Sequence, residues 1–245
     1  MALQCVILAG GLGTRMRPLT GAVPKALVPV LGVPFADRQL ALLAGQGVER
    51  VVYCAGYRAG MLHDHVGDGS RFGLAVAWSD DGEHLLGTAG SIRLALDRGL
   101  LDDAFLVLYG DSYLTAGVAW AEAAWRRSGA PALMTVLRND GRWDRSNCVY
   151  RDGRVVLYDK SRPAGRLAEM RWIDYGLSVL TSAVVAARVP AGAVADLADL
   201  QRDLSLEGDL AGLEVHERFY EAGSPAGLRD LEAYLRDQGR AGVGT

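Results

Sequence analysis

The chain has 245 residues, a formal net charge of −3 and three cysteines. This length can bury the core of one large α/β domain. The charge balance gives no broad basic field, which argues against nucleic acid as a partner. The scattered cysteines form neither a disulfide framework nor a zinc pattern. No apolar run is long enough to cross a bilayer, and the first residues form no leader. We therefore expect a cytoplasmic protein that binds no membrane.

The first predicted element is a buried strand over residues 5–9, followed at once by a glycine-rich loop. Arg15 and Lys25 place fixed positive charge at the two ends of this loop. A dinucleotide motif is excluded because Met16 stands at its third glycine, and a Walker loop because Lys25 precedes an alanine. The glycines allow backbone N–H groups to form an anion-binding nest, so we expect a polyphosphate site. They are Gly10, Gly11 and Gly13.

The next elements alternate between short apolar strands and amphipathic helices. We expect strands at 51–54, 74–78, 105–109 and 133–137, and helices at 35–44, 89–96 and 118–127. Such alternation is typical of a mostly parallel sheet with helices on both faces. Ligands of these sheets bind at the carboxyl ends of the strands, where the glycine-rich loop and Asp111 both fall.

The pattern becomes β-rich beyond about residue 140. Asp152 and Gly153 lie between two short strands and predict a type I′ hairpin, and another strand is expected at 172–180. Helices near 195–204 and 226–236 flank a short strand near 213–219, and residues 239–245 are expected to fray. We expect one domain over residues 1–245, in which the part after residue 140 forms a lid on the first part.

Asp111 directly follows Gly110 at the end of a predicted strand. A carboxylate there is costly unless it is paired or holds a cation, and Mg²⁺ on nucleotide phosphates uses one or two protein carboxylates. The alternative is an aspartate that starts a turn or caps a helix. Late in the chain, Glu221 precedes Ser224 and Pro225, a good helix N-cap and first helical residue.

Residues 10–20 follow the pattern G-G-x-G-T-R-x-x-P-L-T, and residues 24–30 are P-K-A-L-V-P-V. These motifs resemble the opening of the sugar-1-phosphate nucleotidyltransferases, or NDP-sugar pyrophosphorylases. The resemblance implies a Rossmann-like three-layer α/β fold with a mixed, mostly parallel sheet. It implies a nucleotide-binding part at 1–140 and a β-rich sugar-binding insertion with C-terminal helices at 141–238. The implied reaction, of class EC 2.7.7, converts an NTP and a sugar 1-phosphate to an NDP-sugar and pyrophosphate.

The resemblance also implies the roles of the loop and metal residues. Arg15 and the loop amides hold the departing phosphates, and Lys25 steadies the α-phosphate or the sugar phosphate. Asp111 and Glu221 bind Mg²⁺, although the family usually has Asp where this chain has Glu221. The nucleotide contacts are Leu8, Ala9, Gly10, Gly11, Gly13, Thr14 and Arg15, with the base against Gly87, Thr88 and Ala89. Without a ligand, Thr88 would be the N-cap of a helix.

On the sugar side, Lys160 is expected to contact the phosphate of the incoming sugar, and Asp159 its hydroxyls. Asp174 and Gly176 stand where many relatives have Asn-x-Gly, and Asn147 stands where Gly is frequent. Asp174 would therefore accept hydrogen bonds from sugar hydroxyls, or else be a solvated turn residue. These departures affect the identity of the sugar and leave the reaction unchanged.

Two other classes are disfavoured by single residues. A non-catalytic regulatory paralogue tends to lose the loop Arg, the Lys or the metal Asp, and this chain has Arg15, Lys25 and Asp111. A glycosyltransferase D-x-D motif is missing, because residues 110–113 contain one acid. The segment at 87–90 favours mannose- or heptose-1-phosphate guanylyltransferases. We therefore expect GTP and a hexose or heptose phosphate, and leave UTP, CTP and a homodimer open.

Overall fold

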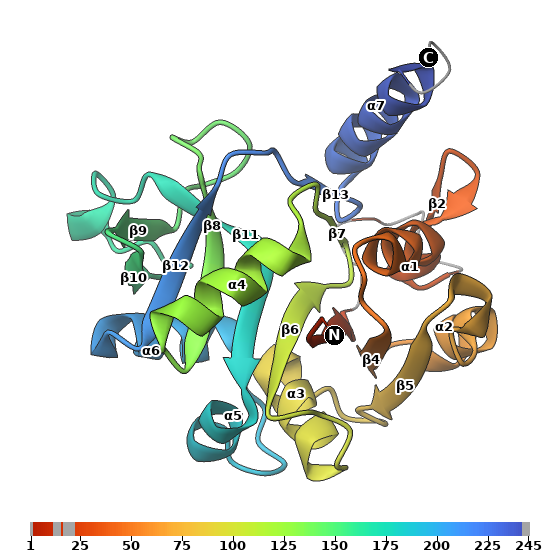
Figure 1. The fold of residues 1–245 in the computed structure, drawn as a ribbon, viewed down its shortest axis with the longest axis horizontal. Coiled ribbons are helices and arrows are strands. Elements are labelled where there is room, and N and C mark those ends of the chain that lie inside the picture. The colour runs from red at the N-terminus through yellow and green to blue at the C-terminus, as the bar shows by residue number, and fades with distance from the viewer. Residues whose placement is uncertain (1, 12–15, 17–22, 242–245) are drawn as a thin grey trace.

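The computed structural model describes residues 2–11, 16 and 23–241. In this part of the chain, a nine-stranded mixed sheet has the order β5-β4-β1-β6-β11-β8-β12-β10-β9 (Figure 1). The four strands from β5 to β6 are parallel. The antiparallel strand β11 joins them to β8, and β12 runs parallel to β8. The mixed, mostly parallel α/β sheet that the resemblance implied is thus confirmed.

The strands of the large sheet are β1 (Gln4–Ala9), β4 (Arg50–Ala55), β5 (Ala75–Asp80), β6 (Ala104–Tyr109), β8 (Ala132–Arg138), β9 (Cys148–Arg151), β10 (Arg154–Tyr158), β11 (Trp172–Thr181) and β12 (Leu210–Val215). Two small ladders pair β2 (Pro29–Val30) with β3 (Val33–Pro34), and β7 (Ser112–Tyr113) with β13 (Tyr220–Glu221). Short 3₁₀ helices span Lys25–Leu27, Ser70–Phe72 and Ala164–Arg166.

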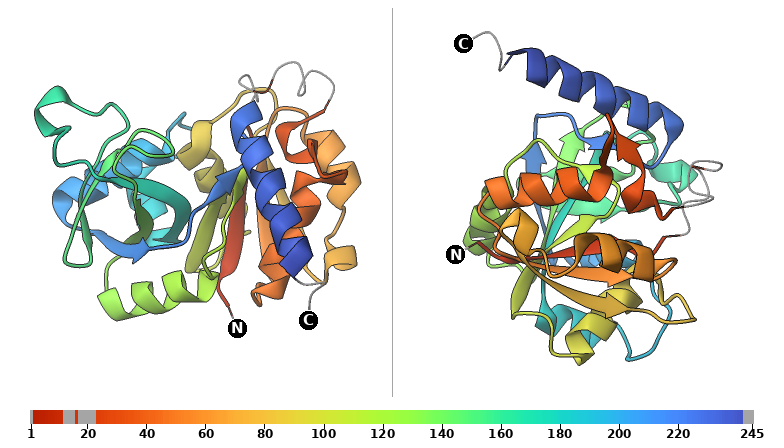
Figure 2. Two further views of the ribbon diagram at one scale, coloured as in Figure 1. Left: turned by 90° about the horizontal axis from the view of Figure 1, so that it is seen from above. Right: turned by 90° about the vertical axis from the view of Figure 1, so that its right-hand side faces the viewer.

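Helices cover both faces of the sheet and so complete three layers (Figure 2). One face is packed by α1 (Phe35–Gly45), α2 (Ala59–Val66) and α4 (Val118–Ser128). The other is packed by α3 (Gly87–Asp97), α5 (Ser182–Arg188) and α6 (Leu197–Glu207). The last helix, α7 (Pro225–Ala241), lies outside these layers, against β13 and β2. None of the helices in the described part is long and apolar enough to cross a membrane.

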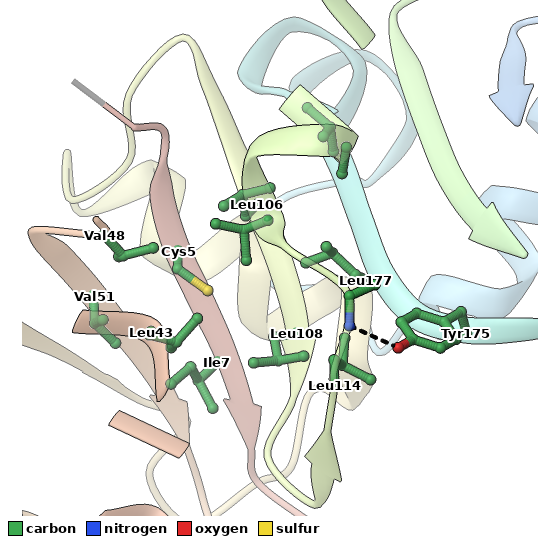
Figure 3. Packing of buried hydrophobic residues seen from close by; sticks show 14 of the residues in the cluster. Cys5, Ile7, Leu43, Val48, Val51, Leu106, Leu108, Leu114, Tyr175 and Leu177 are labelled. Atoms are coloured by element: carbon green, nitrogen blue, oxygen red, sulfur yellow. Dashed lines mark hydrogen bonds between the residues drawn. The ribbon is translucent and has the colours of Figure 1, made fainter. Parts of the chain in front are cut away.

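The core explains why the central strands are continuous apolar runs. Cys5 and Ile7 of β1 pack with Leu106 and Leu108 of β6 on the face that α1 covers (Figure 3). The intervening residues of both strands point to the opposite apolar cluster. Strands buried on both faces need apolar side chains at every position. Beyond the carboxyl ends of β5 and β6, the chain becomes polar at Asp81 and Asp111.

Most predicted elements are confirmed within two residues of their ends. The hairpin prediction is also confirmed, since Asp152 and Gly153 have φ of 49° and 77°. The strand predicted at 213–219 was wrong, because pairing with β8 places it at Leu210–Val215. The chain then leaves the sheet to form β13. Fraying was wrong for residues 239–241, because α7 continues to Ala241, and residues 242–245 lie outside the described residues. Helix α5 was not predicted.

Candidate functional site

The four parallel strands end at one edge of the sheet, where a cavity of about 380 Å³ opens. Gly110 allows two of these strands to lie close together at this edge. A Cβ at Gly110 would lie 2.8 Å from the carbonyl oxygen of Leu8, closer than real Cβ contacts. The glycine therefore allows the end of β6 to pass against β1. The cavity is lined by Leu8, Ala9, Gly10, Gly11, Lys25, Ala26, Cys54, Asp81, Leu85, Gly87, Thr88, Ser91, Tyr109, Gly110, Asp111 and Gly223.

Most of the residues predicted to contact the nucleotide line this cavity. Gly13, Thr14 and Arg15 lie outside the described residues. Ala89 is placed differently from our expectation, because it is buried and its N–H donates to the carbonyl of Ala195 at 2.9 Å. This N–H is therefore not free to contact a base.

Thr88 is not the N-cap of α3, which begins at Gly87. Its hydroxyl instead donates to Asp196 Oδ1 at 2.9 Å and accepts from the N–H of Leu197 at 2.7 Å. Asp196 is the N-cap of α6 and accepts from the N–H of Ala198. Thr88 thus ties the wall of the cavity to the start of a second helix.

Asp81 is a cavity residue that the sequence analysis missed. Its Oδ2 accepts hydrogen bonds from the N–H of Leu86 at 3.1 Å and from Ser91 Oγ at 2.8 Å. Its Oδ1 is buried and has no hydrogen-bond partner among the described residues. Asp81 follows β5 as Asp111 follows β6, and this common position at strand ends was the available signal.

Lys25, Asp111 and Glu221 meet around Gly223. The Lys25 ammonium forms an ion pair with Asp111 Oδ2, and both side chains are largely buried. Glu221 accepts hydrogen bonds from the N–H of Gly223 and from Ser224 Oγ. A Cβ on Gly223 would collide with Glu221, Lys25 and Asp111 together. The glycine thus leaves the space between these charged groups open.

The small β7–β13 ladder brings the two carboxylates together. Glu221 pairs with Ser112, and the N–H of Ala222 donates to the Asp111 carbonyl at 2.8 Å. The buried Gln39 holds the same turn, since its Nε2 donates to the carbonyls of Tyr109 and Ser112 at 3.0 and 2.8 Å. Chain segments far apart in sequence therefore build this part of the site.

The Asp111–Glu221 pair suits a hard divalent cation. Both supply carboxylate oxygens, which Mg²⁺ prefers, and the space that a Gly223 Cβ would fill lies between them. In the described part of the chain, no group of three or more His, Cys, Asp or Glu residues could hold a metal. Two carboxylates are sufficient where substrate phosphates and water complete the shell.

Ser224 confirms the predicted helix start. It precedes Pro225, the first residue of α7, and its Oγ accepts from the N–H of Gly227 at 3.0 Å. The same hydroxyl donates to Glu221, so one side chain both caps α7 and positions a carboxylate.

Of the predicted sugar-side residues, Asn147 and Gly176 are hydrogen-bonded to Asp174 of β11. Its Oδ1 accepts from the N–H of Gly176 at 2.9 Å, and its Oδ2 accepts from the hydroxyl of Tyr158 at 3.3 Å. Its own N–H donates to Asn147 Oδ1 at 3.2 Å. Burial raises the pKa of Asp174, and the positive charge of Lys160 opposes that shift. Asp174 is therefore a partly desolvated acceptor rather than a solvated turn residue.

Asp159 and Lys160 point to different partners. The Lys160 ammonium lies over the ring of Tyr109, 5.7 Å from its centroid. A side-chain hydrogen bond from Ser161 lowers the pKa of Asp159, and the N–H of Ser161, which donates to the carboxylate at 2.7 Å, lowers it further. Lys160 thus reaches toward the cavity, while Asp159 closes its own turn.

Comparisons with known proteins place this chain among sugar-phosphate nucleotidyltransferases by similarity. The Mycobacterium tuberculosis mannose-1-phosphate guanylyltransferase is 34% identical over 136 residues, which cover 56% of this chain and 37% of that protein. The Synechocystis UTP–glucose-1-phosphate uridylyltransferase is 31% identical over 141 residues, covering 54% and 36%. The chain thus spans just over a third of the length of these relatives. The structure of HddC from Yersinia pseudotuberculosis, complexed with GMP-PN, matches 95% of this chain and 99% of that one, with a TM-score of 0.75 at 22% identity.

The sequence profile described as nucleotidyl transferase matches residues 4–142, more than half of the chain. The match runs from β1 through β8 and so includes the cavity-lining ends of all four parallel strands. The chain therefore belongs to the nucleotidyl transferase family.

Proposed function

We propose that this chain is a sugar-1-phosphate nucleotidyltransferase that joins an NTP and a sugar 1-phosphate, releasing pyrophosphate. The observation that carries the proposal is the meeting of Lys25, Asp111 and Glu221 at the wall of a cavity at the strand ends. The family relationship and the names of the relatives support the same reaction.

The proposed chemistry requires positioning and charge rather than a general base. A phosphate monoester has its second pKa near 6, so the attacking oxygen of the sugar phosphate is already ionised at neutral pH. Lys25 lies where its ammonium can neutralise the α-phosphate during in-line displacement. Asp111 and Glu221 would hold Mg²⁺, which supplies positive charge to the phosphate oxygens. Lys160 would hold the phosphate of the incoming sugar.

The cavity favours guanine as the base, and Asp81 carries this part of the proposal. Its Oδ1 is a buried acceptor to which no described residue donates, while Oδ2 already accepts two hydrogen bonds. Guanine offers adjacent donors at N1 and N2. Uracil and thymine offer one N–H between two carbonyl oxygens, which a carboxylate repels. A buried acceptor left unpaired makes the wrong base costly.

A panel of NTPs and sugar 1-phosphates, followed by pyrophosphate release, tests the function. We expect GTP to exceed the other NTPs in kcat/KM by about 100-fold. Asp81→Asn replaces an acceptor with a donor at this position, and should remove most of that preference. Asp80→Asn is the matched control, because the adjacent Asp80 is exposed and does not line the cavity.

The panel separates two failures. Release of pyrophosphate with UTP or CTP in preference to GTP would refute the guanine assignment and leave the reaction standing. No release from any combination, with Mg²⁺ present, would overturn the nucleotidyltransferase proposal itself.

A further inference from the structure

Tyr109 carries a buried hydroxyl that the proposed reaction does not yet use. It is the last residue of β6 and lines the cavity beside Gly110 and Asp111. Its hydroxyl is buried and has no hydrogen-bond partner among the described residues. Buried polar groups almost always have partners, and an unpaired one destabilises the fold. An unpaired hydroxyl at a cavity wall is therefore a position where a ligand can supply the partner.

Tyr109 lies near residues that are predicted to contact the sugar phosphate. The Lys160 ammonium lies over its ring, 5.7 Å from the centroid. Burial raises the pKa of Tyr109, and the negative charges of Asp174, Asp196 and Asp111 raise it further. The phenol therefore stays protonated at any working pH and is available as a hydrogen-bond donor.

A complementary acceptor lies close by on β11. Asp174 is held by the N–H of Gly176 and by the hydroxyl of Tyr158, so its orientation is set before any ligand binds. A protonated phenol and a fixed carboxylate together offer one donor and one acceptor. A sugar hydroxyl both accepts and donates, so it matches this pair in a way that a phosphate oxygen cannot.

We propose that the Tyr109 hydroxyl donates to a ring hydroxyl of the sugar 1-phosphate, while Asp174 accepts from the same or the neighbouring hydroxyl. Tyr109 would then be a residue that determines sugar specificity, and its ring would keep Lys160 beside the incoming phosphate. This inference rests on the proposed function. The Tyr109 contact would select sugars that carry a free hydroxyl at the contacted position.

Tyr109→Phe tests the hydroxyl and retains the ring beneath Lys160. Tyr53→Phe is a matched control, because the Tyr53 hydroxyl is also buried and unpartnered among the described residues, yet Tyr53 lies on β4 against Trp78 and does not line the cavity. Both variants should keep or raise Tm, by up to a few degrees, since each loses an unpaired buried group. Only Tyr109→Phe should raise KM for the sugar phosphate, by about 10- to 100-fold, with KM for the NTP unchanged.

Deoxy analogues of the preferred sugar 1-phosphate identify the contact. The difference between Tyr109→Phe and the parent should disappear for the one analogue that lacks the contacted hydroxyl, and persist for the others. An equal loss with every analogue would overturn the proposal. So would a difference that disappears with a 2′-deoxy NTP instead, because the partner would then be the ribose.

Calorimetric binding of the sugar phosphate separates this inference from the proposed function. A parent protein that binds sugar phosphate more tightly than Tyr109→Phe, without releasing pyrophosphate, would refute the reaction and support the Tyr109 contact. Equal affinity of the parent and Tyr109→Phe would overturn the contact, whatever the turnover.

Discussion

At the scale of single residues, the proposed metal ion would compete with Lys25 for Asp111. Lys25 forms an ion pair with Asp111 Oδ2, at the position where a cation between Asp111 and Glu221 would bind. Binding of the proposed metal would therefore require Lys25 to move, and an arriving phosphate would give its ammonium an alternative partner. Nucleotide and metal are accordingly expected to bind together.

Lys25→Ala should make the nucleotide-free protein bind Mn²⁺ more tightly, by about tenfold, equivalent to ~1.4 kcal/mol. Turnover should fall by at least ~100-fold, because the phosphate loses its positive partner. Mn²⁺ titration followed by electron paramagnetic resonance measures the first effect. Lys160→Ala is the control, since Lys160 lies on the Tyr109 ring and should leave Mn²⁺ affinity unchanged. Mn²⁺ affinity that stays the same in Lys25→Ala would contradict the competition.

Sequence could identify residues whose chemistry follows from one local motif. Lys25, Asp111 and the glycines at the strand ends belong to this group, and all those within the described residues line the cavity. Asp81 was missed although its place at a strand end was a signal, and Tyr109 was missed because its significance depends on a partner that no described residue supplies. Whether a buried oxygen has a donor depends on packing across several strands, and no spacing in the sequence records it.

At the scale of elements, hydrogen bonds between the starts of α3 and α6 hold one wall of the cavity in place. Asp196 Oδ1 accepts from the N–H of Ala198 and from Thr88 Oγ1, so it caps α6 and holds a cavity residue. The carbonyl of Ala195 also accepts from the N–H of Ala89. This contact uses the N–H of Ala89, so that N–H is not available to a base.

Asp196→Ala should lower the free energy of unfolding by about 1–2 kcal/mol, because α6 loses its N-cap. Asp196→Asn keeps an oxygen acceptor and should lose less. Thr181→Ala removes the N-cap of α5, away from the cavity, and should lose stability without a change in KM for the NTP. Urea unfolding measures the free energy of unfolding, and steady-state kinetics measures KM for the NTP. A loss as large in Asp196→Asn as in Asp196→Ala would show that the cap is not the cause.

The positions of helices, strands and turns could be predicted from the sequence where one local pattern determines them. The apolar runs and the Asp152-Gly153 turn are examples. The strand after Asp209 could not be predicted in this way, because pairing with β8 sets its register, from Leu210 opposite Ala132 to Val215 opposite Leu137. Register across such a separation depends on tertiary contacts that local periodicity does not contain.

At the scale of the whole molecule, the sheet is continuous across the two halves of the chain. β11 pairs with β6 and with β8, so residues 172–181 lie between strands that come before residue 140. The alternation of strands and helices predicted the α/β class, but not this insertion. The order of strands in a sheet is decided by which apolar faces pack together, and many orders satisfy the same alternation.

The reactivity of the three cysteines shows whether this sheet is folded, because all three are buried in it. Cys5, Cys54 and Cys148 are free and at most 1% exposed. Burial raises the pKa of Cys5 and of Cys54 to about 12, and also raises that of Cys148. Because the thiolate is the reactive form, the thiols should resist alkylation at pH 8 until the sheet opens.

Iodoacetamide labelling read by mass spectrometry checks this expectation. Urea should expose all three thiols to rapid reaction. GTP should further slow labelling of Cys54, which lines the cavity, and leave Cys148 on β9 unaffected. Complete labelling of the native protein within minutes would contradict the buried placement.

The β7–β13 ladder also has a consequence for how the protein is made. Asp111 leaves the ribosome roughly 5 to 20 seconds before Glu221 at ordinary elongation rates. During that interval the nascent chain already contains the strands β1, β4, β5 and β6, and Lys25 is available to pair with Asp111. The second carboxylate is still untranslated. If Glu221 holds the proposed cation with Asp111, the site is complete only once β13 has been made, so chains terminated before Glu221 are expected to be inert.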